Sequence, residues 1–151
     1  MYCIKMNNDK TLTPTVKTMI YQYEKNADTL VFLIPTTYDN VKITDCNVYL
    51  RFFLPDGRYK SELLDVDQSL YKGYIRCHLR IDTVFTSLPG TIKLWLCLVN
   101  QENSILLKSG KTQVSIIKAP DRMFETDEDD VIYFNNNESE VGDSSDEIIY
   151  F

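Results

Sequence analysis

The sequence has few of the residues from which catalytic sites are built. Histidine occurs once, at position 78, and no serine, cysteine or carboxylate stands at a fixed spacing from it that would mark a triad or dyad. The five glycines are scattered, which excludes a glycine-rich phosphate loop, and the His/Glu spacing of a metalloprotease is absent. We therefore predict that the protein is not an enzyme and has no cofactor, and that His78 lies at a surface or rim.

Cysteine is present but in no arrangement that binds zinc or exchanges disulfides. The four cysteines are far apart in the sequence, and none forms a Cys-x-x-Cys pair. Three of them fall within apolar runs typical of strands. We expect buried free thiols, which fits synthesis in a reducing cytoplasm. The four residues are Cys3, Cys46, Cys77 and Cys97.

Candidate metal ligands are equally sparse. Asp65 and Asp67 form a lone Asp-x-Asp without the further oxygens and glycine of a calcium loop. The consecutive acids at positions 127–130 offer suitable oxygens but no scaffold, so we interpret them as attracting counterions diffusely, with calcium as the lesser alternative. The prediction is that there is no metal site.

Long hydrophobic runs are also missing. No stretch approaches the ~18 apolar residues of a membrane span, and the first residues lack the basic and apolar regions of a signal peptide. We expect a soluble protein with no membrane partner and no recognisable secretion signal.

Charge is distributed unevenly along the chain. Of 16 basic and 22 acidic residues, residues 1–120 hold 15 and 11, a balance of +4, whereas residues 121–151 hold 1 and 11, a balance of −10. We predict a folded domain at 1–120 and an acidic tail at 121–151. The basic excess of the domain is modest and lacks clusters interleaved with aromatic residues, which argues against nucleic-acid binding. The tail could lie on its own domain, on a neighbouring copy or on another basic surface.

Short β-prone runs separated by turn residues fill the domain and predict an all-β fold. Seven or eight such strands in about 110 residues favour an immunoglobulin-like β-sandwich over a barrel. The segment 65–74 is the one place where a short helix or a loop is predicted instead. The expected strands lie within 11–23, 29–34, 46–54, 59–66, 75–82, 91–99, 104–107 and 112–117.

The tail contains a duplicated apolar tetrad. The segment Asp129–Phe134 recurs, with conservative changes, as Asp146–Phe151, 17 residues later. Acidic runs bury little and repel each other, whereas four β-prone apolar residues gain free energy only when something covers them. We interpret the tetrads as two partner-binding motifs, formed by Val131, Ile132, Tyr133, Phe134, Ile148, Ile149, Tyr150 and Phe151.

Each tetrad is predicted to add as a β-strand to an exposed sheet edge. Val131, Tyr133, Ile148 and Tyr150 would then lie on one face and the other four residues on the opposite face. The 17-residue spacing could span about 50 Å if extended, far enough to reach separate sites. The alternative is that both motifs fold back onto their own sandwich.

Four segments of the domain resemble a family of immunoglobulin-like domains from tailed bacteriophages of low-GC Gram-positive hosts, typified by the N-terminal domain of the baseplate upper protein. The resemblance covers residues 10–118. It implies a non-enzymatic building block that attaches a protein to the virion. The chain departs from the family in lacking coiled-coil heptads after Pro120. The segments are Ala27–Pro35, Tyr49–Gly57, Leu88–Leu96 and Leu107–Thr112.

Together these features predict a bacteriophage virion structural protein, associated with the capsid or with the baseplate and tail. It would be made in the bacterial host cytoplasm. Its expected partners are other virion proteins and its own copies, in a multi-copy assembly. The alternative is a cytoplasmic adaptor or inhibitor whose acidic tail occupies a basic groove of a host protein.

Overall fold

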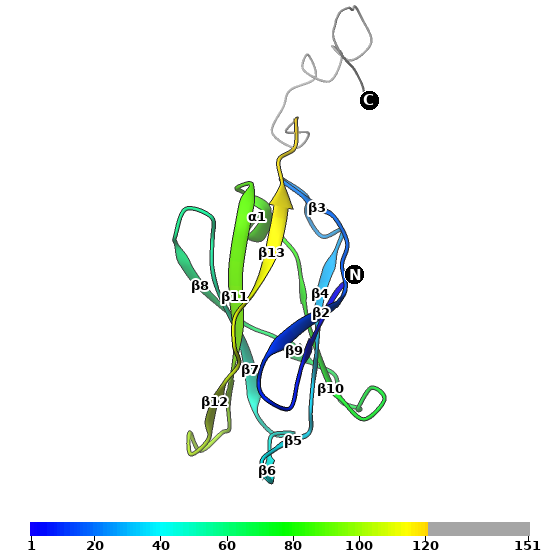
Figure 1. Ribbon diagram of the computed structural model, residues 1–151, viewed down its shortest axis with the longest axis vertical. Coiled ribbons are helices and arrows are strands. Elements are labelled where there is room, and N and C mark those ends of the chain that lie inside the picture. Colours follow the sequence, from blue (N-terminus) through cyan, green and yellow to red (C-terminus); the bar gives the residue numbers. More distant parts are fainter. Residues whose placement is uncertain (121–151) are drawn as a thin grey trace, which may run out of the picture. The chain divides into compact units, whose positions relative to one another are not determined.

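Two β-sheets face each other across a shared apolar core (Figure 1). The computed structural model describes residues 1–120, and both sheets lie within the unit Met1–Lys118. One sheet, sheet A, has the strand order β2-β1-β4-β10-β9. Its strands are β1 (Tyr2–Met6), β2 (Leu12–Val16), β4 (Thr29–Ile34), β9 (Asp65–Val66) and β10 (Ile75–Arg80).

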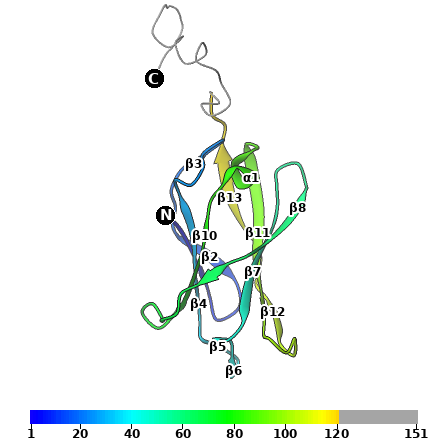
Figure 2. The same cartoon turned by 180° about the vertical axis from the view of Figure 1, so that it is seen from behind.

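The other sheet, sheet B, has the order β3-β13-β11-β7-β8, and β12 also pairs with β11. A small hairpin of β5 (Thr37–Tyr38) and β6 (Val41–Lys42) lies between β4 and β7 in the chain. Figure 2 shows the two layers from behind. The strands of sheet B are β3 (Ile20–Tyr21), β7 (Asn47–Phe53), β8 (Tyr59–Leu63), β11 (Gly90–Val99), β12 (Leu106–Lys108) and β13 (Thr112–Ile117).

This arrangement confirms the predicted immunoglobulin-like sandwich. In such folds one sheet holds the first, second, fifth and fourth strands, and the other holds the third, sixth and seventh with extra strands at the edge. Here β1-β4-β10-β9 and β8-β7-β11-β13 follow those two orders. One difference is that β1 pairs with β4 in parallel, while β2 forms the antiparallel edge.

Period-two alternation along the strands builds the core. In β7, Val48, Leu50 and Phe52 are buried, and the residues between them are only half-buried. Their partners Leu94, Leu96 and Leu98 in β11 are buried beside them. Successive side chains of a strand point to opposite faces, so these residues meet the buried side chains of sheet A.

One end of the sandwich is covered by the short helix α1 (Thr83–Thr86). The carboxylate of Asp82 caps it by accepting hydrogen bonds from the backbone N–H groups of Val84 and Phe85. The Phe85 ring lies 5.3 Å from that of Phe52, centroid to centroid. Thr86 is fully buried, and its hydroxyl donates a hydrogen bond to the Glu24 carbonyl at 2.8 Å. The helix therefore closes the core with one aromatic ring and a satisfied hydroxyl.

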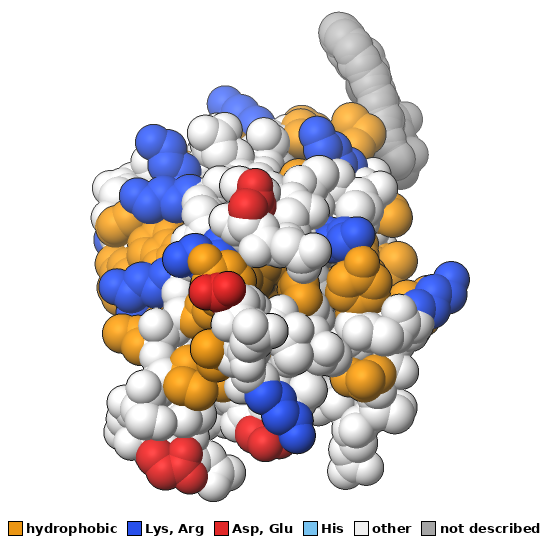
Figure 3. Space-filling view, turned by 60° about the horizontal axis from the view of Figure 1, so that its bottom comes forward, with side chains coloured by type: hydrophobic (Ala, Val, Ile, Leu, Met, Phe, Trp, Pro, Cys, Tyr) orange, Lys and Arg blue, Asp and Glu red, His pale blue; other side chains and the backbone are white. Residues whose placement is uncertain are grey.

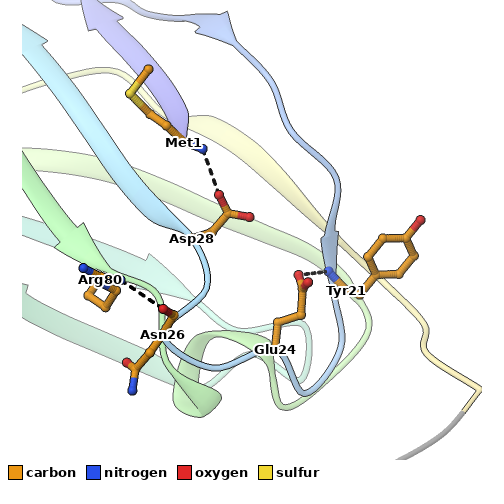
Figure 4. Close-up of polar contacts among 6 residues, drawn as sticks. All are labelled: Met1, Tyr21, Glu24, Asn26, Asp28 and Arg80. Atoms are coloured by element: carbon orange, nitrogen blue, oxygen red, sulfur yellow. Dashed lines mark hydrogen bonds and ion pairs between the residues drawn. The ribbon is translucent and has the colours of Figure 1, made fainter.

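Polar contacts fix the loop before β4 at the same end (Figure 4). The carboxylate of Glu24 accepts a hydrogen bond from the backbone N–H of Tyr21, in sheet B, at 2.8 Å. The guanidinium of Arg80, in sheet A, donates to the Asn26 carbonyl at 2.9 Å. The Met1 ammonium lies 2.9 Å from the Asp28 carboxylate. This loop thus bridges the two sheets.

The structure also contains elements that the sequence patterns did not predict. Strand β1 is buried on both faces and so lacks alternation, while β5, β6 and α1 are too short to show a period. In the segment 65–74 the prediction of a helix is wrong. Residues 65–66 form β9 and pair with β10, and the rest of the segment is a loop with a Tyr71–Tyr74 bridge. All four cysteines are buried and unpaired, as predicted.

We predict that Phe85→Ala lowers the free energy of unfolding by about 3–5 kcal/mol, because it removes a fully buried ring and leaves a cavity against Phe52. Urea unfolding followed by circular dichroism measures the change. The matched control is Val84→Ala in the same helix, where the side chain is exposed and the expected loss is below about 1 kcal/mol. Equal losses in both variants would contradict the assigned role of α1.

A second prediction concerns alkaline pH. Burial, followed by the charge of Asp67, raises the pKa of the Cys77 thiol from 9.0 to about 12. Above pH 9 the unfolded thiol ionises while the folded thiol keeps its proton, so the unfolded state binds fewer protons and stability falls with rising pH. Between pH 9 and 12 this group lowers the free energy of unfolding by at most about 1.4 kcal/mol per pH unit.

Comparison with Cys77→Ala isolates this effect from other alkaline titrations. Denaturant unfolding at pH 8, 9, 10 and 11 should give a steeper loss of stability in the parent than in the variant. The same pH slope in both proteins would contradict the assignment to Cys77.

Candidate protein-interaction surface

The outward face of sheet B carries an unusual group of large side chains. Phe53 lies beside Tyr59 and Trp95, with ring centroids 5.7 Å and 5.5 Å away, and the Tyr59 and Trp95 rings are 6.2 Å apart. Arg51 and Leu63 lie on the same face. We call these five residues the aromatic face.

Strand register brings the aromatic face together. Arg51 stands opposite Trp95 of β11 on one side and Ser61 of β8 on the other. Phe53 stands opposite Tyr59. Directly opposed residues of antiparallel strands project on the same side of the sheet, so β7 places Arg51 and Phe53 at the centre of the face.

The face is basic as well as apolar. Arg51, Lys93 and Lys108 point outward, and Lys111 lies over the Trp95 ring at 5.4 Å. Among the outward positions of β7, β8, β11, β12 and β13 there is no aspartate or glutamate. In Figure 3, hydrophobic side chains lie among lysines and arginines on the left, the side on which β8 and β11 lie in Figure 1. An anionic apolar partner would match this surface.

Arg51 is only partly satisfied. Its Nε atom is buried but has no hydrogen-bond partner in the part of the chain described. A buried donor without a partner is unfavourable. Guanidinium groups pair with carboxylates through two parallel hydrogen bonds, so a carboxylate arriving at this face would find a desolvated donor.

Exposure is concentrated at the β8 side of the face. Tyr59 is 50% and Leu63 57% exposed, although both are large and apolar. Contiguous exposed apolar surface marks interaction sites, and tyrosine, tryptophan and arginine are the residues that most often dominate binding energy at interfaces.

The turn before β8 is fixed by Asp56, whose carboxyl pKa is lowered by hydrogen bonds from the backbone and side chain of Arg58.

The outward face of sheet A holds the residues considered as ligands or catalysts. His78 is half-exposed, and its Nδ1 atom lies 3.3 Å from Asp67, whose second oxygen lies 3.4 Å from Nε of Arg76. Asp65 stands opposite His78 in the register of β9 and β10. The sequence expectation that His78 lies at a surface is confirmed.

The Cys3 thiol does not stand within reach of this pair. Cys3, Val31 and His78 lie in one row across three neighbouring strands, so two strand spacings, about 10 Å, separate the thiol from the imidazole. No three side chains of histidine, cysteine, aspartate or glutamate come together to hold a metal ion within residues 1–120. What the cluster can do is bind ions and hydrogen-bond at the surface.

The predicted partner-binding residues of the tail, 131–134 and 148–151, lie outside the described residues. The aromatic face itself was missed by the sequence reasoning. Its signal was present in two outward alternating sets, Tyr49-x-Arg51-x-Phe53 and Tyr59-x-Ser61-x-Leu63. The more obvious pattern in β7 is the alternation of its inward-pointing core residues.

No protein-family model and no curated protein sequence matches this chain. Among solved structures, the chain is similar to the N-terminal domain of phage TP901-1 ORF48, with 5% sequence identity and a TM-score of 0.41. The match covers 78% of this chain and 94% of that domain.

A search for membrane-spanning helices gave none among residues 1–120.

Proposed function

We propose that the protein is a non-enzymatic structural component of a bacteriophage virion that binds neighbouring virion proteins. The observation that carries the proposal is the aromatic face, an exposed apolar and basic surface on a rigid sheet. The family resemblance of residues 10–118 supports the virion as its location. The acidic tail is the second binding element.

The geometry of the face favours a protein partner over a stacked sugar or base. The Tyr59 ring is tilted by 37° from Trp95 and by 60° from Phe53, so the three rings form no flat platform. Lys111 lies over the Trp95 ring. Side chains of an opposing protein can fill such an uneven surface, and Arg51 offers them a carboxylate site.

Weak contacts of this kind suffice in a virion. Subunits stand at high local concentration on a symmetric lattice, and two motifs on one chain raise the effective concentration of each other. The domain would supply one contact surface and the tail a second one. The salt dependence of binding distinguishes this proposal from the alternative, an adaptor that fills a basic groove by charge alone. Charge-driven binding weakens steeply with salt, whereas apolar strand contacts persist.

We predict that Trp95→Ala weakens the complex between the full chain and purified virion proteins at least tenfold, because it removes the largest of the three rings of the face. Binding is followed by size-exclusion chromatography with light scattering, and circular dichroism verifies the fold. The control is Tyr71→Ala, which removes an exposed ring from the far sheet. The face has no binding role if Trp95→Ala binds as the parent does.

For the tail we predict that Tyr133→Ala with Phe134→Ala, or Tyr150→Ala with Phe151→Ala, weakens assembly while the domain keeps its melting temperature. The reason is that each pair removes the aromatic half of one tetrad. Asn136→Ala with Asn137→Ala, between the tetrads, is the matched control. Assembly at parental strength by both aromatic double variants would return the tail to a solubilising role.

A further inference from the structure

The β8 edge of sheet B is built to accept an added strand. The edges of sheets A and B in the described part of the chain are formed by β2, β3, β8, β9 and β12, and both strands of the small β5-β6 hairpin are edges of two residues each. Strands β3 and β9 have two residues each, β12 has three, and β2 contains Pro14. Short length and proline are the usual devices that protect an edge from pairing. Strand β8 has five residues and no proline.

The hydrogen bonds at the two ends of β8 show which of its backbone N–H and C=O groups point toward β7 and which point toward the open edge of the sheet. The Leu54 N–H donates to the Arg58 carbonyl, and the Leu64 N–H donates to the Val48 carbonyl, both at 2.9 Å. Backbone groups in an antiparallel pair alternate between facing the partner and facing away. The backbone N–H and C=O groups of Lys60 and Glu62 therefore face β7. Those of the other three residues between positions 58 and 64 point away from β7, toward the open edge.

Those three residues are Tyr59, Ser61 and Leu63, the β8 members of the outward face. Residues of an added strand that pair with them would project onto the same face. Their side chains would cover the exposed Tyr59 and Leu63 and extend the aromatic face by one strand. On the inward side the new strand would meet Lys60 and Glu62, both half-buried.

We propose that this edge binds an apolar tetrad of a second copy of the chain, at residues 131–134 or 148–151. This inference rests on the proposed function and names the acceptor of its tail. A strand of four residues, whose side chains alternate between its two faces, fits the backbone N–H and C=O groups of β8 that point to the open edge. The acids before each tetrad, Asp129-Asp130 and Asp146-Glu147, match a face whose outward charges are all basic.

The length of the tail allows a second copy as the source. Each chain carries two tetrads but one five-residue, proline-free edge within its described residues, so tetrads outnumber such edges in any set of copies. The 25 residues between Pro120 and Asp146 span up to about 80 Å when extended. That reach exceeds the dimensions of a domain of this size.

The test uses the full chain and sedimentation velocity over a range of concentrations. Ser61→Pro removes one outward N–H without breaking a hydrogen bond to β7, and it should weaken self-association at least tenfold. Ser61→Ala keeps the N–H and should associate as the parent does. Melting temperatures verify the fold, and Ser61→Glu, which places an acid against the acidic motif, decides the matter if the proline variant does not fold.

Combination with the tail separates the two proposals. In a chain with alanine at positions 133, 134, 150 and 151, Ser61→Pro should have no further effect. Loss of self-association in the tail variant, but not in Ser61→Pro or Ser61→Glu, would overturn the β8 site while leaving the tail as a docking element. A parent that stays monomeric at all concentrations would overturn the second copy as the occupant, and virion binding measured with the same proteins would then test the proposed function alone.

Discussion

The pairing of β7 with β11 is the interaction on which the rest of this domain depends. It joins seven residues of each strand in one antiparallel register, from Asn47 with Val99 to Phe53 with Lys93. The inward members form the core layer against sheet A, and the outward members form the aromatic face. A shift by one residue would exchange the two faces and place Arg51 in the core. Burial of Leu50, Phe52, Leu94 and Leu96 therefore fixes the position of Arg51 and Trp95 as well.

Strand pairing also constrains the outward side chains. Side chains on a paired sheet are held by the ladder beneath them, so little conformational entropy remains to be lost on binding. Cys97 illustrates how closely the outward layer packs, because it points outward by register yet is fully buried. The exposed parts of the layer, Tyr59 and Leu63, lie where the ladder ends and a further strand would continue it.

The sequence predicted the fold class because most strands have one buried face. Strands β7 and β10 show this alternation plainly, and the residues Pro55–Arg58 are typical of a turn. Elements without a period were missed: β1 is buried on both sides, and α1 has four residues. The aromatic face was missed although its outward residues alternate along β7 and β8, because the placement of Trp95 beside Arg51 depends on the pairing of β7 with β11, a long-range pairing that no local pattern encodes. The tail motifs were visible only because they are duplicated.

An open sheet edge and segments of β-prone apolar residues in one chain create a risk of uncontrolled aggregation. The charge distribution offers a physical restraint. Eleven acids against one basic residue make tails repel one another, so a tetrad is disfavoured from pairing with another tetrad. A surface that is both basic and strand-compatible relieves that repulsion, and the outward face beside β8 has both properties. In the proposed assembly the acids would therefore favour docking of an apolar tetrad on a basic sheet over pairing of one tetrad with another.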